Sequence, residues 1–325
     1  MAYIHIPKAW KKIAAKASEE NVYFNRREIL KKMGWISAGL MSLPLVHACE
    51  GVGPDNKEFT FERMDEFYPS MRSSLYPIDR PLTDEHAATH HNNFYEFISP
   101  DDSNIYNVHK YVADFDNRDW HIEVSGLVGR PGTYFLGDLI REMGLEERTY
   151  RHRCVEAWAM AVPWTGFQLS KLIDFLQPDN KATHIRMISY SDKKEMIGVE
   201  TQDWYPWPYF EGLRMEEAMN ELAFVATGLY GKPMPKQNGA PVRLVIPWKY
   251  GYKSIKSIVK IEFIDSEPET FWHQVVPEQY GFLSNVDPAI PHPNWSQARE
   301  VMLGSGAVRN TQKFNGYGDF VAHLY

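Results

Sequence analysis

The stretch YRHRCVEAWAMAVPW, Tyr150 to Trp164, surrounds a single cysteine with basic residues on one side and acidic and aromatic residues on the other. Near Cys154 it follows neither the period of a strand nor that of a helix, which indicates a loop that presents a side chain. We expect Arg151 and Arg153 to lower the pKa of the thiol and so favour the thiolate, the nucleophilic and metal-binding form. Three roles remain open for Cys154: a small buried hydrophobe, a nucleophile paired with a histidine, or a ligand of a soft metal.

Charge is unevenly distributed along the 325 residues, whose net charge is −7. Residues 1–48 carry eight lysines and arginines against three acidic residues, a net charge of +5, so residues 49–325 carry −12. An acidic body argues against nucleic acid as a partner, because phosphate backbones are bound by basic surfaces. Two cysteines form no disulfide framework, and their spacing fits no zinc motif. No apolar run reaches the roughly 18–20 residues of a membrane-spanning helix.

The basic N-terminal segment contains paired arginines in NRREILKK, Asn25 to Lys32, followed by the mildly apolar run MGWISAGLMSLPLVHA. This layout predicts a twin-arginine export signal over residues 1–48 and a periplasmic protein that is exported folded. A short helix with a basic face is the alternative. LVHAC is also a loose match to a lipoprotein cleavage site at Cys49, although His47 fits it poorly. Cleavage near Ala48 would leave Cys154 as the only internal thiol.

Hydrophobic periodicity predicts an α+β, β-rich domain over residues 85–325, preceded by an extended polar arm over residues 49–84. Alternating or apolar runs predict strands over residues 119–128, 184–190, 221–227, 241–247 and 258–264. Helical spacing predicts helices over residues 135–144 and 169–178, the first stopped by glycine and the second by proline. In the second helix, Leu169, Leu172, Ile173 and Leu176 are expected to face inward.

A basic cluster lies in KQNGAPVRLVIPWKYGYKSIKSIV, Lys236 to Val259. It brings Arg243, Lys249, Lys253 and Lys256 together with glycine and serine, whose backbone N–H groups can turn toward an anion. On an acidic body this composition predicts a phosphate cradle, although it matches neither a P-loop nor a dinucleotide fingerprint. Solvated lysines beside two ordinary strands are the alternative.

A third polar motif is HHNNFYEF, His90 to Phe97. Neighbouring residues of a strand point to opposite faces, so His90 and His91 are not expected to share a zinc ion. The amide, hydroxyl and carboxyl groups of Asn92, Tyr95 and Glu96 have the hydrogen-bonding capacity to read a polar heterocycle.

Taken together, these motifs resemble the catalytic subunits of the periplasmic, molybdenum-dependent protein-methionine-sulfoxide reductases, a family of the sulfite oxidase superfamily. The resemblance rests on the three motifs above and on YFEGLRMEEAM, EQYGFLSNVDP and FNGY, and it covers nearly all of residues 90–325. It implies a sulfite-oxidase-type molybdopterin-binding fold. The implied cofactor is molybdenum–molybdopterin without an added nucleotide.

The resemblance also assigns individual residues. It implies that Cys154 is the single thiolate ligand of molybdenum and the catalytic residue. Ser189 falls where the family usually has threonine, in the strand that follows the cysteine helix. The implied cofactor contacts are Asn92, Tyr95, Glu96, Ser189, Asn238, Arg243, Ser254, Ile255 and Lys256. Arg151 and Arg153 are candidates for orienting an oxygen-bearing substrate.

The implied reaction removes an oxygen atom from methionine sulfoxide in oxidised periplasmic proteins. The sequence has no C-x-x-C-H haem motif and no set of iron–sulfur cysteines. The family implies that electrons come from a membrane haem b subunit fed by quinol, with this chain as the monomeric catalytic subunit of a heterodimeric system. Two other functions remain open: sulfite oxidation at the same centre, and an exported anion-binding protein without a metal.

Overall fold

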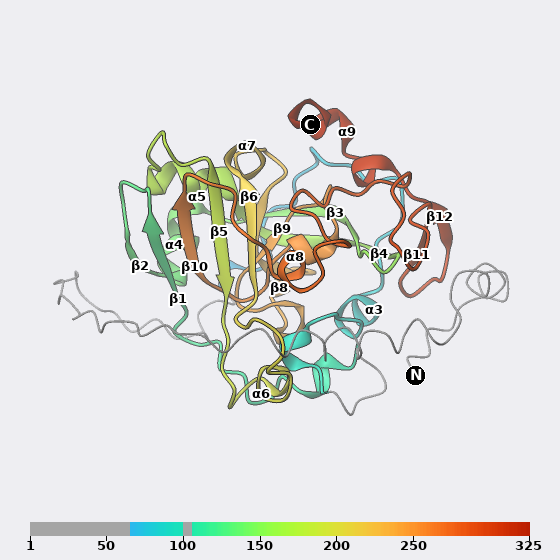
Figure 1. Cartoon of the computed structure of the whole chain (residues 1–325), viewed down its shortest axis with the longest axis horizontal. Helices are drawn as coiled ribbons and strands as arrows, with labels where there is room; N and C mark the ends of the chain where they lie inside the picture. Colours follow the sequence, from blue (N-terminus) through green and yellow to red (C-terminus); the bar gives the residue numbers. More distant parts are fainter. Residues whose placement is uncertain (1–65, 100–105) are drawn as a thin grey trace.

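Two mixed β-sheets build the fold in this computed structural model, which describes residues 66–99 and 106–325 (Figure 1). The five-stranded sheet, on the left in Figure 1, has the order β2-β1-β10-β5-β6. Its strands are β1 (His121–Gly126), β2 (Gly132–Phe135), β5 (His184–Ser189), β6 (Phe210–Arg214) and β10 (Ile258–Ile264). Strands β1 and β10 run parallel, and the other neighbours in this sheet run antiparallel.

The seven-stranded sheet has the order β12-β11-β4-β7-β8, with β3 paired to β4 and β9 paired to β7. Its strands are β3 (Glu146–Arg153), β4 (Trp158–Gln168), β7 (Phe224–Leu229), β8 (Lys232–Pro233), β9 (Arg243–Val245), β11 (Arg299–Met302) and β12 (Val308–Asn310). Strand β11 runs parallel to β4, which brings the C-terminal part of the chain beside the strand that follows Cys154.

The helices of the described residues are short. The α-helices are α3 (Glu85–Thr89), α4 (Leu136–Met143), α5 (Leu169–Leu176), α6 (Ile197–Thr201), α7 (Met215–Ala218), α8 (Phe271–Val275) and α9 (Gly318–Val321). The 3-10 turns are η2 (Tyr95–Phe97), η3 (Val108–Lys110), η4 (Lys236–Asn238), η5 (Gly251–Lys253), η6 (Lys313–Gly316) and η7 (Ala322–Leu324). No helix in residues 66–99 or 106–325 is long and apolar enough to cross a membrane.

Periodicity located several of these elements correctly. In α5, the four apolar residues expected to face inward are all buried, and the helix ends at Leu176, just before Gln177 in the left-handed conformation. In β10, Ile261 and Phe263 are buried while Lys260 and Glu262 are partly exposed, as the alternation predicted. Helices α4 and α5 pack on each other and on β4. The α+β, β-rich class is confirmed.

The expected loop around Cys154 is a tight turn between two strands that the sequence analysis did not predict. Strands β3 and β4 form a hairpin whose register runs from Glu146 opposite Gly166 to Arg153 opposite Ala159. Cys154 lies in the tight turn between them: its N–H donates to the carbonyl of Trp158 (2.9 Å), and Ala157 adopts a φ of 68°. It therefore lies on a β-turn and not on a helix, contrary to the implied cysteine helix. Strand β3 was not predicted because charged residues are buried on both of its faces, so its sequence shows no alternation of apolar and polar residues.

Residues 66–84, part of the expected arm, lie against the hairpin. Arg72 bridges to Glu147 in β3, and the N–H of Thr83 donates to the carbonyl of Ala161 in β4 (2.8 Å). The expected export signal, residues 1–48, lies outside the described residues.

Candidate functional site

Cys154 lies at a cavity of about 210 Å³ into which four separate segments project. They are the turn around η2, the β3–β4 hairpin, the segment from β9 through η5, and an aromatic wall that includes residues of α8. Eight of the ten residues expected at the site line this cavity: Asn92, Tyr95, Glu96, Cys154, Arg243, Ser254, Ile255 and Lys256. The fold thus gathers motifs that are more than 160 residues apart in the sequence.

Ser189 and Asn238 do not line the cavity but hold the backbone behind it. The Ser189 hydroxyl donates to the carbonyl of Lys256 (2.8 Å), and the Asn238 amide donates to the carbonyl of Ala88 (3.1 Å). Within the described residues, Asn238 Oδ1 is buried and has no hydrogen-bond partner, and the same holds for Asn93 Oδ1, whose residue lines the cavity. Buried acceptors left without donors are costly, so the Asn93 oxygen, whose residue lines the cavity, suits a site that a ligand completes.

The Cys154 thiol is buried, and its surroundings do not favour the thiolate. Burial raises the pKa of the Cys154 thiol well above its ordinary value, and the Glu156 carboxylate raises it further. Arg153 and Lys256 lower the pKa, but by less. The expectation that flanking arginines depress this pKa is therefore wrong for the cofactor-free chain. The Glu156 N–H points at the sulfur, with N to Sγ at 3.5 Å, and a bound cation would reverse the balance in favour of the thiolate.

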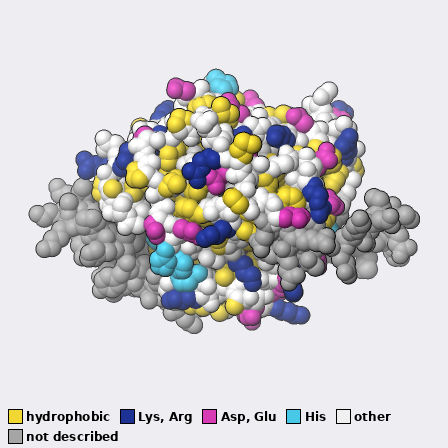
Figure 2. Space-filling model, turned by 180° about the vertical axis from the view of Figure 1, so that it is seen from behind, with side chains coloured by type: hydrophobic (Ala, Val, Ile, Leu, Met, Phe, Trp, Pro, Cys, Tyr) yellow, Lys and Arg dark blue, Asp and Glu magenta, His cyan; other side chains and the backbone are white. Residues whose placement is uncertain are grey.

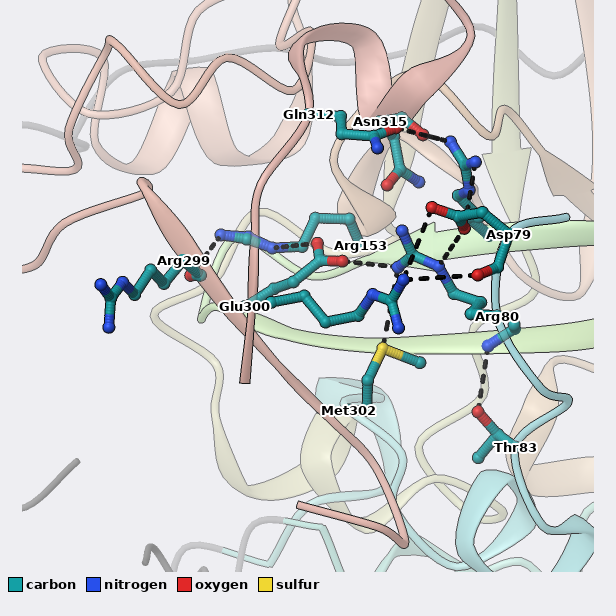
Figure 3. Close-up of polar contacts among 12 residues, drawn as sticks. Asp79, Arg80, Thr83, Arg153, Arg299, Glu300, Met302, Gln312 and Asn315 are labelled. Carbon is teal, nitrogen blue, oxygen red and sulfur yellow. Dashed lines mark hydrogen bonds and ion pairs between the residues drawn. The ribbon is translucent and has the colours of Figure 1, made fainter. Parts of the chain in front are cut away.

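Arg151 and Arg153 turn away from the cavity, so their expected role in orienting a substrate is wrong. Arg151 donates to the carbonyl of Asn315 (2.7 Å) and pairs with Asp79 (3.1 Å). Arg153 is fully buried against Glu300, as Figure 3 shows. Alternation along β3 instead directs His152 into the cavity. Burial lowers the pKa of His152 well below its usual range, and nearby Arg243 and Lys256 add to this, which keeps the ring neutral.

The basic cluster divides into two pairs. Lys249 is buried in an ion pair with Glu217 (2.5 Å), and Lys253 is buried in an ion pair with Glu211 (2.5 Å). Neither lysine lines the cavity, so the expectation that all four cations form one cradle is wrong. The alternative of solvated lysines is wrong for these two as well.

Arg243 and Lys256 form the pair that lines the cavity. The Arg243 guanidinium donates to the carbonyls of Asn238 (2.8 Å) and Ser254 (3.1 Å), and Lys256 Nζ donates to the carbonyl of Asn93 (2.7 Å). In the described part of the chain, neither cation makes an ion pair. Burial lowers the pKa of Arg243 to about 9. Burial, with the nearby Arg243, lowers the pKa of Lys256 to about 7. Two buried cations without a counter-ion fit the anionic end of a cofactor.

Glu96 completes the polar side of the cavity. Burial raises the pKa of its carboxyl to about 7, although Lys256 and hydrogen bonds from its own backbone and from Ser189 oppose the shift. A carboxyl held close to neutrality can serve as a hydrogen-bond donor as well as an acceptor, which suits a heterocycle with ring nitrogens and oxygens. The side chain of Asn92, at the same end, is held by donation to the carbonyl of Thr89 (2.8 Å).

His90 and His91 point in different directions, although they follow α3 and are not in a strand. His91 stacks on Tyr106 at 3.8 Å between ring centroids, and His90 contacts the rings of His86 and His109. On the face shown in Figure 2, histidine side chains form one group in the lower part of the view and another lies at the top, while acidic and basic side chains are intermingled. No group of three or more histidine, cysteine or acidic residues in residues 66–99 and 106–325 is arranged to hold a metal ion.

Several cavity residues were missed by the sequence analysis. They are His152, Glu156 and Trp158 from the hairpin, and the aromatic residues Tyr205, Tyr209, Trp272 and Tyr280. Gly251 from η5, one of the glycines of the basic cluster that the sequence marked as an anion site, also lines the cavity. A Cβ at this position would lie 2.5 Å from His152 Nε2, so only glycine fits beside the ring. The aromatic wall comes from segments with no common motif and gave no such signal.

A sequence profile of the oxidoreductase molybdopterin binding domain matches residues 109–272, which include Cys154, Arg243 and Lys256. The chain belongs to this molybdopterin-binding family. It is 46% identical over 253 residues to the protein-methionine-sulfoxide reductase catalytic subunit MsrP of Pseudomonas syringae pv. tomato, covering 76% of this chain and 74% of the relative. It is 40% identical over 323 residues to the MsrP catalytic subunit of Xanthomonas campestris pv. campestris, covering 98% and 96%. The resemblance that the motifs indicated is thereby confirmed.

Among solved structures, the chain is similar to the sulfane dehydrogenase SoxCD from Paracoccus pantotrophus, with a TM-score of 0.42 and 15% identity, over 82% of this chain and 63% of that one. Family membership confirms the molybdopterin-binding fold and the molybdenum–molybdopterin cofactor. The cavity fits this cofactor because it combines one thiol, two buried cations that form no ion pair with the described residues, and a polar rim.

Proposed function

We propose that this protein is the catalytic subunit of a periplasmic, molybdenum-dependent reductase that repairs methionine sulfoxide in oxidised proteins. The observation that carries the proposal is the similarity, at 40% identity over almost the full length of both chains, to a relative named protein-methionine-sulfoxide reductase catalytic subunit. The cavity supports it independently, because it offers a single soft ligand beside an anion-binding pair.

In this proposal Cys154 ligates the metal, and Arg243 and Lys256 neutralise the anionic end of the pterin. Glu96, Asn92 and Tyr95 would contact the pterin from the segment next to Lys256, whose Nζ donates to the carbonyl of Asn93 (2.7 Å), and Ser254 and Ile255 would contact it beside Lys256. Ser189 and Asn238 act indirectly, by fixing the backbone of the contact segments. When bound, the molybdenum–molybdopterin group supplies two-electron oxygen-atom transfer. The net reaction converts a sulfoxide, two electrons and two protons into a thioether and water.

The chain's own residues shape the place where the sulfoxide side chain would lie. Tyr205, Trp272 and Tyr280 line the cavity, and their rings contact one another at centroid distances between 5.4 and 6.0 Å. Aromatic rings make favourable contacts with methionine sulfur, so this wall suits the side chain of both substrate and product. The neutral His152 adds a polar group to the opposite wall without placing another charge beside the cofactor.

Electron supply and location are further parts of the proposal. The full sequence has two cysteines, too few to hold an iron–sulfur cluster. We therefore assign electron donation to a membrane haem b subunit that docks transiently on this monomeric subunit near Cys154, since redox contacts are typically small. The paired Arg26 and Arg27 support export to the periplasm by the twin-arginine route.

The experiment compares wild-type protein with Cys154→Ser, both purified from molybdenum-replete cells. We expect the wild type to contain molybdenum and to reduce methionine sulfoxide in an oxidised protein when given an artificial one-electron donor. Cys154→Ser should fold but lose almost all activity, because a hydroxyl replaces a soft thiolate poorly. Gln312→Glu, at a residue that does not line the cavity, should keep wild-type molybdenum content and activity and serves as the control variant.

Two results would contradict the proposal. Wild-type protein that oxidises sulfite and leaves oxidised protein unchanged would assign the other reaction of the superfamily. Wild-type protein that lacks molybdenum but binds phosphate would assign an anion-binding protein instead. Full turnover by Cys154→Ser would remove the ligand role of the thiol while leaving the reaction class intact.

A further inference from the structure

The segment before β11 encloses the turn that carries Cys154. Strand β11 runs parallel to β4, and the N–H of Val301 donates to the carbonyl of Ala157, the last residue of the turn (2.9 Å). Residues 295–300 therefore lie beside the turn although they are about 140 positions away in the sequence. Two of their side chains, those of Trp295 and Gln297, reach the residues that flank the cysteine.

Gln297 contacts both neighbours of Cys154 through one buried amide group. Its Oε1 accepts a hydrogen bond from Arg153 Nη2 (2.6 Å), and its Nε2 donates to the carbonyl of Val155 (2.7 Å). Trp295 Nε1 donates to the same carbonyl (2.8 Å). The Val155 carbonyl thus receives two donors, which is the full capacity of its two lone pairs.

The Val155 carbonyl and the Glu156 N–H belong to one planar peptide unit. In a trans peptide the C=O and the N–H point in opposite directions, so fixing one fixes the other. The Glu156 N–H is the backbone group that donates to Cys154 Sγ, with N to Sγ at 3.5 Å. The two donors from residues 295 and 297 therefore hold the N–H in its orientation toward the sulfur.

Arg153, the other end of this arrangement, is itself immobilised. Its guanidinium is fully buried, lies 3.7 Å from Glu300 Oε2 and is held by Gln297. The other oxygen of Glu300 pairs with Arg80 Nη1 at 2.5 Å. Figure 3 shows Arg153 and Arg80 on either side of the Glu300 carboxylate, with Asp79 beyond Arg80. Gln297 consequently has a fixed anchor from which to orient the peptide.

We propose that Gln297, assisted by Trp295, is a positioning residue for the sulfur of Cys154: it orients the 155–156 peptide so that its N–H donates to Sγ. A hydrogen bond to a metal-bound sulfur withdraws electron density from it and raises the reduction potential of the metal. This inference rests on the proposed role of Cys154 as the molybdenum ligand only for its effect on the potential. Its effect on the thiol applies to the cofactor-free chain as well.

The main test is Gln297→Glu. A glutamate still accepts from Arg153, so the anchor is retained, but an ionised carboxylate has no proton to donate to the Val155 carbonyl. We expect normal folding and molybdenum content, a more negative molybdenum potential and a changed Mo(V) spectrum in the loaded enzyme. In the cofactor-free full-length chain, iodoacetamide should modify Cys154 about two- to tenfold more slowly, because the thiolate loses roughly one net hydrogen bond and a smaller fraction of the thiol is ionised. Peptide mapping separates Cys154 from Cys49.

The matched control is Gln312→Glu. Gln312 Oε1 accepts from Arg151 (3.0 Å), so the same substitution is made beside an arginine of the same strand, without a contact to the 155–156 peptide. It should leave the potential, the spectrum and the alkylation rate unchanged.

A second variant, Trp295→Phe, removes the other donor while keeping a ring that can stack on His292, which lies at 3.7 Å between centroids. It should shift the same measurements in the same direction, and it keeps the inference testable if Gln297→Glu does not fold. The inference is overturned if a folded Gln297→Glu or Trp295→Phe protein has the alkylation rate and Mo(V) spectrum of the wild type. Failure of Cys154→Ser to lose turnover would instead concern the proposed function, since alkylation of the cofactor-free chain requires no metal.

Discussion

Replacing Lys249 by methionine should destabilise the fold without weakening the cofactor site. Lys249 Nζ donates to Glu217 Oε1 (2.5 Å), to the carbonyl of Leu283 (2.7 Å) and to Asn285 Oδ1 (2.9 Å), and the side chain is buried. Removing one partner of a buried ion pair typically costs about 3–5 kcal/mol, because the other charge is left uncompensated.

The structure places the expected cost at the lower end of that range. Glu217 keeps three contacts in the variant: the hydroxyl of Tyr325 (2.5 Å), the backbone N–H of Arg214 (3.0 Å) and the more distant guanidinium of Arg214 (3.8 Å). We therefore expect a loss of about 3 kcal/mol in the free energy of unfolding. For a domain of this size the loss corresponds to a fall of about 6–12 °C in Tm.

The assay is denaturant unfolding of the purified protein, with pterin measured per folded molecule. Lys260→Met is the matched control, because Lys260 forms partly exposed ion pairs with Glu123 and Glu262 and should cost less than about 1 kcal/mol. The double variant Glu217→Gln, Lys249→Met should recover part of the loss, since the orphaned charge is removed. A Lys249→Met protein of wild-type stability that has lost its pterin would refute this reasoning and return Lys249 to the cofactor cradle.

Three more predictions concern Glu217, Lys256, and the pair Arg26 and Arg27. Burial raises the pKa of Glu217, but Lys249, together with hydrogen bonds from Tyr325 and the Arg214 N–H, more than offsets this and leaves the pKa below its ordinary 4.5. The contribution of ionised Glu217 to stability is therefore present above about pH 4.5 and is lost as pH falls through the folded pKa. The stability gap between wild type and Glu217→Gln, measured by urea unfolding, should begin to narrow below that pH, and a constant gap down to acid unfolding would contradict the assignment. Lys256→Met should lower the pterin bound per folded protein by about tenfold, because one charge-assisted hydrogen bond to the cofactor is lost. Full pterin content in this variant would exclude Lys256 as a cofactor contact. Arg26→Lys with Arg27→Lys should leave folded, cofactor-loaded protein in the cytoplasm, whereas normal periplasmic yield on fractionation would refute the export signal.

Local periodicity predicted those elements whose stability depends on one apolar face. Helix α5 and strand β10 are of this kind, because their inward residues repeat at 3.6 and 2 positions. Strand β3 could not be found in this way. Its sequence EERTYRHR is almost wholly polar, yet Arg148 and Arg153 are among the most buried side chains, because they are neutralised or stacked by residues far along the chain.

The same limit applies to the site. The resemblance to the family singled out Cys154, Arg243 and Lys256, and the structure places all three at the cavity. Composition alone grouped Lys249 and Lys253 with Arg243 and Lys256, because their acidic partners come from β6 and α7 and are recognised only in the tertiary structure. The sequence could not predict that Gln297 contacts Arg153 and Val155, the two neighbours of Cys154, because this contact depends on the parallel pairing of β11 with β4.

The parallel pairing of β11 with β4 also determines whether the cofactor can be inserted during or only after synthesis of the chain. The turn that carries Cys154 is held by Trp295 and Gln297, and Glu300, beside Arg153, is held in turn by Arg80, 220 positions earlier in the chain. A ribosome that has just released the hairpin of β3 and β4 has not yet synthesised half of the groups that enclose the thiol. The complete pocket therefore exists only after residue 300 has emerged and folded back, so the pterin meets its full binding site on a finished chain, and cofactor insertion follows synthesis.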